Sequence, residues 1–499
     1  MGTPAGRIDP IVQLERETSH VENESRKWWD EVVRLTGDLG DDVTGSLRIP
    51  LYVFLRDSAP LGWRKFCGNL ASTARLFRPR RRQALPHAEK GRLLFCFAHE
   101  TPSHVRNLLP VARESARRGL LGGIVCAENA LPHVQEFAKA FPVVSANRLA
   151  RQDGFVDQAR AFRKSLAAFR QIRSAVKRSH PEWLARWQAN RSRILREIAT
   201  SVQMTRVFGE LLSAWAPSGV VSTSDFWPLE YQMCRQAARA RIPSVLVQHG
   251  TIGHFWWPFV ADTYLLWGDF YRDQLAALGA PAESLRSCGM PATDDLFRAA
   301  QQHPALERPW REPPVCLILS HTHGRSLEAE TFARFGKLLQ EVLPATPQFR
   351  WKVKLHPSED DAFYRELGGA IYSRLEFHPR SVSLEETIQD CDIAMTVFST
   401  SALEAMILRR PVVVLGVTAK GREYGWWPQQ GGGVYAGTPE ELLGHLSRLV
   451  QQDESRAAQL ETQQRFLDRC FASPRRAAES VVDCLEELQG SSRPARAAK

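Results

Sequence analysis

Residues 219–248 have the sequence GVVSTSDFWPLEYQMCRQAARARIPSVLVQ, and this stretch decides the fold class. Two short apolar runs, at residues 219–222 and 244–248, flank a segment with helical periodicity at residues 229–240. Such runs are typical of strands that are buried on both faces, and parallel strands need a crossover connection, which a helix supplies. The stretch therefore predicts a β–α–β unit with parallel strands.

The same alternation of strand and helix signals extends outward from this unit in both directions. In the first half of the chain we expect further strands at residues 93–98, 123–126 and 264–267, and a helix at 105–118. In the second half we expect strands at residues 315–320, 349–355, 393–397 and 411–415, and helices at 328–342 and 402–409. This alternation predicts an α/β fold with two mainly parallel sheets. Neither half has a G-x-G-x-x-G or G-x-x-x-x-G-K-[ST] motif, so the main sequence evidence for a dinucleotide-binding protein or a P-loop protein is absent.

The chain divides into four expected segments. These are a basic, helical appendage at residues 1–90, a first α/β domain at 91–303, a second α/β domain at 304–485 and a disordered tail at 486–499. Strand signals disappear at about residues 155–213, where apolar residues recur at helical spacing, so we expect a helical insertion there, broken at His180 and Pro181. Residues 304–314 are rich in proline and charge, which is typical of a linker.

The composition is that of a globular protein. Of the 499 residues, 43% are hydrophobic and 24% are charged, which excludes a wholly disordered chain. No apolar run approaches the roughly 18 residues of a membrane-spanning helix, and residues 1–9 lack a signal pattern, so we expect a cytoplasmic protein. The nine cysteines are odd in number and scattered, which argues against a disulfide framework and against a Cys-x-x-Cys metal site.

The formal net charge of +10 favours an anionic partner. The run from Arg64 to Arg82 has seven basic and no acidic residues, and we expect it to attach the protein to the anionic inner face of the cell membrane. Residues 155–178 have seven basic residues, the single acid Asp157 and an apolar stripe, which equally suits a helix that packs into the core. Nucleic acid is not an expected partner, because the basic stretches lack the aromatic interleaving of a platform on which bases stack, and no recognition module is present.

The segment from Phe398 to Met406 follows a predicted strand and opens a predicted helix. Hydroxyl groups together with free N–H groups at a helix start suit a phosphate or diphosphate, so Ser399, Thr400 and Ser401 are candidate donor-binding residues. Glu404 lies one turn further on, where a carboxylate could accept hydrogen bonds from ribose hydroxyls. The alternative is that a hydroxyl residue caps the helix and Glu404 completes a capping box.

Two further loops of the second half carry candidate donor-binding residues. His356 and Lys354 end a predicted strand, where open parallel sheets bind ligands, and His356 could stabilise charge on a departing nucleoside phosphate. A turn residue held by Pro357 is the alternative for His356. The other candidates are Ser320, Thr322 and Arg325. Between them, His321 and His323 have a metal-like spacing, but no carboxylate or cysteine set accompanies them and no Asp-x-Asp motif is present, so we expect no metal.

The first half carries the candidate base. His249 follows the strand at residues 244–248, and we expect it to be a general base, a contact to the donor or a turn residue. Gly250 and Thr251, with His254, form a loop in which glycine lets the backbone approach a ligand, and we assign this loop to the acceptor side. Polar loops after other strands supply further base candidates, namely Asp225, Glu100 and His99.

Taken in order, these motifs resemble those of bacterial GT-B fold transferases of surface-polymer biosynthesis. The likeness is greatest to the CDP-glycerol glycerophosphotransferase and capsule polysaccharide glycosyltransferase families. It rests on His249 to Thr251, on His356 with Pro357, on Ser399 to Ser401, and on Glu404 to Met406 followed by Arg410 to Val413, and it covers roughly residues 93–450. Arg409 or Arg410 stands where that last pattern usually has glycine.

The resemblance implies a GT-B type fold of two Rossmann-like domains that face a cleft. It further implies a CMP-, CDP- or UDP-linked donor bound in the second half, an acceptor glycan or lipid-linked acceptor bound in the first half, inversion, no cofactor and no metal. We therefore expect a transferase that moves a sugar or polyol phosphate onto a capsule, lipopolysaccharide or related glycan. The alternatives are a nucleotide-sugar 2-epimerase of the same fold and a non-catalytic glycan-binding or scaffold protein.

Overall fold

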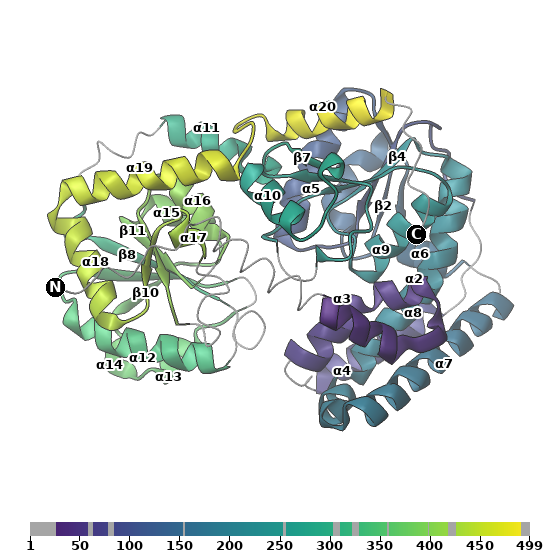
Figure 1. Cartoon of the computed structure of the whole chain (residues 1–499), viewed down its shortest axis with the longest axis horizontal. Coiled ribbons are helices and arrows are strands. Elements are labelled where there is room, and N and C mark those ends of the chain that lie inside the picture. The colour runs from purple at the N-terminus through teal and green to yellow at the C-terminus, as the bar shows by residue number, and fades with distance from the viewer. Residues whose placement is uncertain are drawn as a thin grey trace. The chain divides into compact units, whose positions relative to one another are not determined.

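The computed structural model describes residues 26–57, 63–77, 84–152, 155–252, 256–302, 310–321, 329–356, 359–397, 399–417 and 426–490. These residues divide into two compact units, each built on its own sheet (Figure 1). Among the described residues, the N-terminal unit comprises those from 26 to 292 together with 476–490, and the C-terminal unit comprises those from 293 to 475. The domain boundaries expected from the sequence stay predictions, since most of the linker at 304–314 and of the tail at 486–499 lies outside the described residues.

A seven-stranded sheet forms the centre of the N-terminal unit, and all its neighbouring strands pair in parallel. The strands are β1 (Leu93–Phe97), β2 (Leu121–Cys126), β3 (Val143–Ser145), β4 (Gly219–Ser222), β5 (Ser244–Val247), β6 (Thr263–Leu266) and β7 (Leu285–Ser287), in the order β3-β2-β1-β4-β5-β6-β7. Every residue of β1, β2, β4, β5 and β6 is buried, as expected for a parallel sheet that is covered on both faces.

Helices cover both faces of this sheet and extend beyond it. They are α2 (Asp41–Ser46), α3 (Arg48–Tyr52), α4 (Trp63–Leu76), α5 (Pro102–Arg117), α6 (Ala146–Ala150), α7 (Phe155–Ser179), α8 (Leu184–Trp215), α9 (Pro228–Arg239), α10 (Asp269–Ala277) and α20 (Ala477–Gly490), with shorter turns η1 (Gly37–Leu39), η2 (Val53–Asp57), η3 (Leu131–Lys139), η4 (Pro181–Trp183), η6 (Ala282–Ser284) and η7 (Pro291–Thr293). The expected break at His180 and Pro181 separates α7 from η4 and α8. The last helix, α20, packs against α5.

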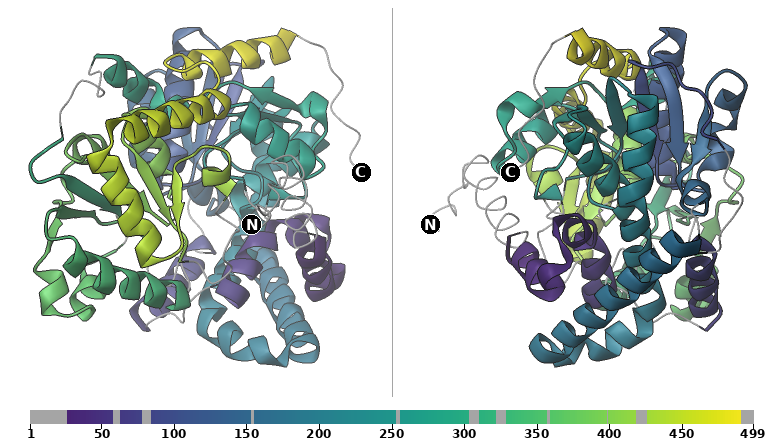
Figure 2. Two further views of the ribbon diagram at one scale, coloured as in Figure 1. Left: turned by 60° about the vertical axis from the view of Figure 1, so that its left-hand side comes forward. Right: turned by 90° about the vertical axis from the view of Figure 1, so that its right-hand side faces the viewer.

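The long helix α8 belongs to two hydrophobic cores. Its second half, including Phe208 and Trp215, packs against the sheet. Its first half, including Trp187, packs with α7 and with Trp28 of the helix at residues 26–36 in a separate core. The basic N-terminal region and the helical insertion therefore share one core, and the α7–α8 hairpin projects away from the sheet (Figures 1 and 2).

The C-terminal unit is built on a six-stranded parallel sheet. Its strands are β8 (Val315–Leu319), β9 (Arg350–Lys354), β10 (Leu375–Phe377), β11 (Ile393–Thr396), β12 (Val412–Leu415) and β13 (Val434–Ala436), in the order β10-β9-β8-β11-β12-β13. Its helices are α11 (Asp294–Gln302), α12 (Ala329–Ala345), α13 (Ala362–Glu366), α14 (Gly369–Tyr372), α15 (Leu384–Gln389), α16 (Ser401–Ile407), α17 (Trp426–Gln429), α18 (Pro439–Gln451) and α19 (Asp453–Cys470). The predicted α/β class with two parallel sheets is confirmed.

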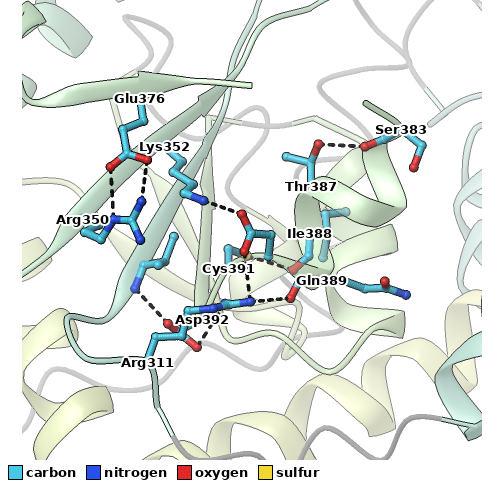
Figure 3. Close-up of polar contacts among 12 residues, drawn as sticks. Arg311, Arg350, Lys352, Glu376, Ser383, Thr387, Ile388, Gln389, Cys391 and Asp392 are labelled. Carbon is cyan, nitrogen blue, oxygen red and sulfur yellow. Dashed lines mark hydrogen bonds and ion pairs between the residues drawn. The ribbon is translucent and has the colours of Figure 1, made fainter. Parts of the chain in front are cut away.

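A network of charged residues ties together the segments that lead into this sheet (Figure 3). Arg311 lies 3.1 Å from Asp390 and 3.6 Å from Asp392, and Lys352 of β9 pairs with the other oxygen of Asp390. Asp392 in turn accepts a hydrogen bond of 2.8 Å from the backbone N–H of Val315, the first residue of β8. These side chains connect the start of β8 and the segment just before β11 to the middle of β9.

None of the helices in the described residues is long and apolar enough to cross a membrane.

Candidate functional site

Three adjacent strands of the N-terminal unit bring its polar loops to one edge. Because β1, β4 and β5 are parallel neighbours, their carboxyl ends lie at the same edge of the sheet. His99 and Glu100 follow β1, residues 223–225 follow β4, and His249 follows β5. The structure thus brings together the base candidates His99 and His249, which lie 150 residues apart in the sequence.

His249 is half-buried, and its ring is held in one tautomer. Its Nδ1 atom lies 2.6 Å from the carbonyl oxygen of Thr223. A carbonyl oxygen only accepts hydrogen bonds, so Nδ1 carries the proton and Nε2 of the neutral ring keeps its lone pair. The ring is thereby prepared to accept a proton at Nε2.

Two further imidazole rings pack beside His249. The His104 ring stacks on His249, with centroids 3.8 Å apart and planes inclined by 22°, and the His99 ring lies 4.2 Å from His104. His104 Nδ1 lies 2.7 Å from Thr223 Oγ1, and His99 Nε2 lies 3.0 Å from Glu230 Oε2. Glu230, in the first turn of α9, is fully buried and also accepts a hydrogen bond of 2.9 Å from Ser224. We refer to His99, His104, His249 and Glu230 as the histidine cluster.

The pKa values of the three imidazoles are shifted in different directions because their surroundings differ. Burial lowers the pKa of His249 to about 4, although its hydrogen bond to Thr223 opposes this. Burial, together with the two neighbouring rings, holds the pKa of His104 well below its usual range. Burial would also lower the pKa of His99, but the charge of Glu230 and the hydrogen bond to it outweigh burial and raise that pKa. His249 and His104 are therefore neutral at neutral pH.

The remaining first-half candidates occupy different surroundings. Asp225 is fully buried, and its Oδ2 accepts hydrogen bonds from Tyr264 at 2.5 Å and from the backbone N–H groups of Val260 and Ala261. Glu100 is exposed. Gly250 and Thr251 follow His249 directly, and Gln248 donates a hydrogen bond of 2.9 Å to the carbonyl of Gly250. His254 lies outside the described residues.

The N-terminal region also contributes to this edge. Arg48, which begins α3, is almost completely buried and donates a hydrogen bond of 2.8 Å to the carbonyl of Pro258. Pro258 lies two residues before Val260, whose N–H donates to Asp225. Arg48 and Asp225 therefore fix the same loop between β5 and β6. Residues that the sequence suggested were an appendage thus help to shape the candidate site.

The histidine cluster includes groups that could hold a metal ion. His99, His104 and Glu230 each offer one ligand atom, and these atoms lie within 4.8 Å of one another. Imidazole nitrogen and carboxylate oxygen are common ligands of zinc. Hydrogen bonds to Glu230 and Thr223 already engage His99 Nε2 and His104 Nδ1, so metal binding would have to replace them. The expected metal-free mechanism stays a prediction.

In the C-terminal unit, three adjacent strands again bring candidate residues to one edge. Ser320 and His321 follow β8, His356 follows β9, and Ser399 follows β11, and these strands are parallel neighbours in the order β9-β8-β11. His321 is buried, its Nε2 lies 2.9 Å from Thr396 Oγ1, and burial together with the charge of His356 lowers its pKa to about 3. His356 is exposed.

A buried carboxyl group that the sequence did not reveal lies behind these loops. Glu359 is 6% exposed and accepts hydrogen bonds from Ser320 Oγ at 3.0 Å and from the backbone N–H of His356 at 3.2 Å. Tyr364 donates a hydrogen bond of 2.6 Å to the same Ser320 hydroxyl. Burial raises the pKa of Glu359 to about 7. Glu359 therefore links the loops after β8 and β9.

The hydroxyl residues at the start of α16 contact one another. Ser399 Oγ lies 2.6 Å from Ser401 Oγ, and the Ser399 N–H donates to Thr396 Oγ1 at 3.1 Å. Thr400 occupies the N-cap position without a capping hydrogen bond from its side chain, and Glu404 is buried in the first turn. Lys354 donates to the carbonyls of Pro379 and Val382. The expected donor contacts of Thr322 and Arg325, and the residues His323, Pro357 and Phe398, fall outside the described residues.

No family model and no curated protein matches the chain. Solved structures do match it. One is a UDP-GlcNAc 2-epimerase from Neisseria meningitidis bound to UDP-GlcNAc, with a TM-score of 0.51 over 79% of this chain and 100% of that chain. Another is a UDP-N-acetylglucosamine 2-epimerase, with a TM-score of 0.50 over 82% and 100% of the two chains, and a third is MnaA of S. aureus with UDP, at 0.50 over 80% and 97%. Sequence identity is 12% in all three cases, so the likeness establishes the fold: two parallel-sheet units of the GT-B type.

Proposed function

We propose that this protein is an enzyme that acts on a nucleotide-activated sugar and transfers the sugar, or a polyol phosphate, to an acceptor hydroxyl. The observation that carries the proposal is the geometry of His249. Its Nδ1–H is bound to the Thr223 carbonyl, so a neutral imidazole presents the lone pair of Nε2 at the carboxyl edge of the sheet. The GT-B type fold, and the UDP-GlcNAc and UDP that two of the solved structures bind, support a nucleotide-activated donor.

In the proposed reaction His249 acts as the general base. Its Nε2 takes the proton of the acceptor hydroxyl while the hydroxyl oxygen bonds to the donor carbon or phosphorus, and the bond to the nucleotide phosphate breaks. His104 and Thr223 position the ring through the stacking contact and the carbonyl hydrogen bond. The proposed contacts of the departing phosphate are His356, Ser399 and Ser401. The same proposal gives the donor a pyrimidine base, as in CMP, CDP or UDP, and lets Glu404 accept hydrogen bonds from its ribose.

The carboxylates of the N-terminal unit favour transfer to a hydroxyl. Asp225 and Glu230 are fully buried and bound within the protein, which leaves the imidazoles and the exposed Glu100 as bases at this edge of the described residues. An imidazole assists removal of a proton from an oxygen more readily than from a carbon, because a hydroxyl is much the stronger acid. A surface glycan such as capsule or lipopolysaccharide is the proposed acceptor.

A nucleotide-sugar 2-epimerase is the second candidate, and the solved structures favour it, because two of the three are described as such enzymes. An epimerase would remove the proton at C2 of the sugar and return one to the opposite face. Both candidates need the same nucleotide-sugar site, and they differ in whether a carbon-bound proton is exchanged.

Incubation with UDP-N-acetylglucosamine in heavy water separates the two candidates. Without an acceptor, an epimerase yields the 2-epimer with deuterium at C2, whereas a transferase leaves C2 unlabelled. A panel of CMP-, CDP- and UDP-linked donors with glycan acceptors should then release free nucleotide, and the His249→Ala variant should release far less. Nucleotide binding without either product would instead support a binding or scaffold protein.

A further inference from the structure

Helix α7 carries three of the five large apolar side chains that are exposed among the described residues. Phe155 is 78% exposed, Val156 is 66% exposed and Phe162 is 44% exposed. Exposed apolar residues are normal when they are scattered singly, but a cluster within eight residues of one helix marks a contact surface.

Phe155 and Phe162 lie on one side of the helix, next to its buried face, and Val156 lies about 100° around the helix from Phe155, on the side of the basic residues. Phe155, Ala159, Phe162 and Leu166 follow the i, i+4, i+7, i+11 spacing of a single helical face. The buried residues of α7, such as Ser165 and Ile172, follow a different face that packs into the core shared with α8. The apolar face at the start of α7 is therefore not the one that packs into the core.

A strongly basic face flanks this apolar face. All seven basic residues between positions 155 and 178 are exposed, and they are Arg160, Arg163, Lys164, Arg170, Arg173, Lys177 and Arg178. The single acid in that range, Asp157, lies 3.1 Å from Arg160. The α7–α8 hairpin projects away from the sheet (Figure 1), so the described residues of this unit leave this surface accessible.

We propose that the first half of α7 docks on an anionic membrane surface, with Phe155, Val156 and Phe162 inserted at the level of the lipid headgroups. Aromatic and aliphatic residues beside a basic face are what an interfacial helix uses, since the apolar side chains enter the headgroup region and the basic ones attract lipid phosphates. A second copy of the chain is disfavoured as the occupant because it carries the same net charge of +10.

This surface differs from the one expected from the sequence. The basic run from Arg64 to Arg82 lies partly outside the described residues. A neighbouring contact connects the two regions, since the Phe77 ring, just after α4, lies 5.2 Å from the Phe162 ring. The proposal places the apolar anchors on α7, and it does not depend on the proposed transferase activity.

Co-sedimentation of the full chain with vesicles tests the proposal. We expect binding to phosphatidylcholine vesicles that contain phosphatidylglycerol, weaker binding at high salt and little binding to phosphatidylcholine alone. The double variant Phe155→Ser, Val156→Ser should bind at least about tenfold more weakly, because it loses two apolar side chains that the proposal buries among the lipid headgroups. The triple variant Arg163→Gln, Lys164→Gln, Arg170→Gln should lose about 100-fold, at about fivefold for each basic residue near the surface.

Matched controls use residues of the same kind elsewhere. Val33→Ser removes an exposed valine (43% exposed) outside α7, and Lys139→Gln, Lys337→Gln, Arg465→Gln removes three exposed charges outside α7, and both should bind like the wild type. Absence of wild-type binding at low salt overturns the proposal. The proposal is also overturned if the Phe155→Ser, Val156→Ser variant binds vesicles as strongly as the wild type, because the attraction would then be purely electrostatic. A wild-type dimer that this variant converts to a monomer, with vesicle binding unchanged, would assign the surface to a second copy.

Discussion

Replacing Glu359 with glutamine should stabilise the C-terminal unit at alkaline pH and leave it nearly unchanged at acidic pH. The carboxyl group has a pKa of about 7 in the folded protein, against 4.5 as its ordinary value. Because the folded pKa is the higher one, ionisation favours unfolding. The stability of the wild type should therefore fall as the pH rises from about 4.5 to about 7 and stay constant above that.

The magnitude follows from the same two values. The difference between about 7 and 4.5 corresponds to about 3 kcal/mol of unfolding free energy. Glutamine is neutral at every pH, and its amide can keep both contacts, with its oxygen accepting from the His356 N–H and its NH2 group donating to Ser320 Oγ. The variant should thus exceed the wild type by about 3 kcal/mol near pH 8 and by little near pH 5.

Hydrogen exchange of peptides from β8 and β9 measures the unfolding free energy of the C-terminal unit alone, so unfolding of the N-terminal unit does not affect the result. The comparison is between variant and wild type at each pH. Glu330→Gln is the matched control, because the side chain of Glu330 is 61% exposed in the same unit, and it should show little pH-dependent difference. A difference between Glu359→Gln and wild type that is equal at both pH values, or a variant that is less stable near pH 8, would show that ionisation of Glu359 does not destabilise the folded unit.

Three further predictions concern activity. His249→Ala should lower turnover by about 100- to 10,000-fold with nucleotide affinity retained, as expected for a lost general base, and near-normal turnover would remove His249 from that role. His356→Ala and Ser399→Ala should each reduce turnover by about 100-fold or more without unfolding the protein, and two folded, fully active variants would contradict the proposed phosphate contacts. Activity should survive dialysis against EDTA, because imidazole and hydroxyl groups are proposed to do the work of a metal. Loss of activity that zinc or manganese restores would instead point to His99, His104 and Glu230 as ligands.

The long buried strands could be predicted from the sequence because burial on both faces leaves an unbroken apolar run. The expected strand at 219–222 coincides with β4, and the one at 315–320 differs from β8 by one residue. The edge strands β3, β7, β10 and β13 were missed. Each has three residues, and β7 and β10 contain Arg286 and Glu376, so no apolar run marks them.

The site could be predicted only as far as the loops. The sequence identified the polar loops that carry His99, Thr223 and His249, but only the parallel order of β1, β4 and β5 shows that these loops meet at one edge of the sheet. His104 and Glu230 were missed as site residues, because both lie inside helices. The partner of Glu230, His99, is 131 residues away, so nothing local shows that the carboxylate is buried. Glu359 was missed because its neighbours in the sequence do not show that its carboxyl group is buried. Its position three residues after His356 is a signal that could have been used.

Thermal unfolding with and without nucleotides tests most directly the claim that the chain binds a nucleotide-activated donor. A ligand at about 100 times its dissociation constant adds about 2.7 kcal/mol, which corresponds to a rise of roughly 5–10 °C for a unit of this size. We expect such a rise for at least one of CMP, CDP and UDP or their sugar conjugates, and a smaller rise for Ser399→Ala. No stabilisation of the wild type by any of these nucleotides at millimolar concentration would contradict that claim.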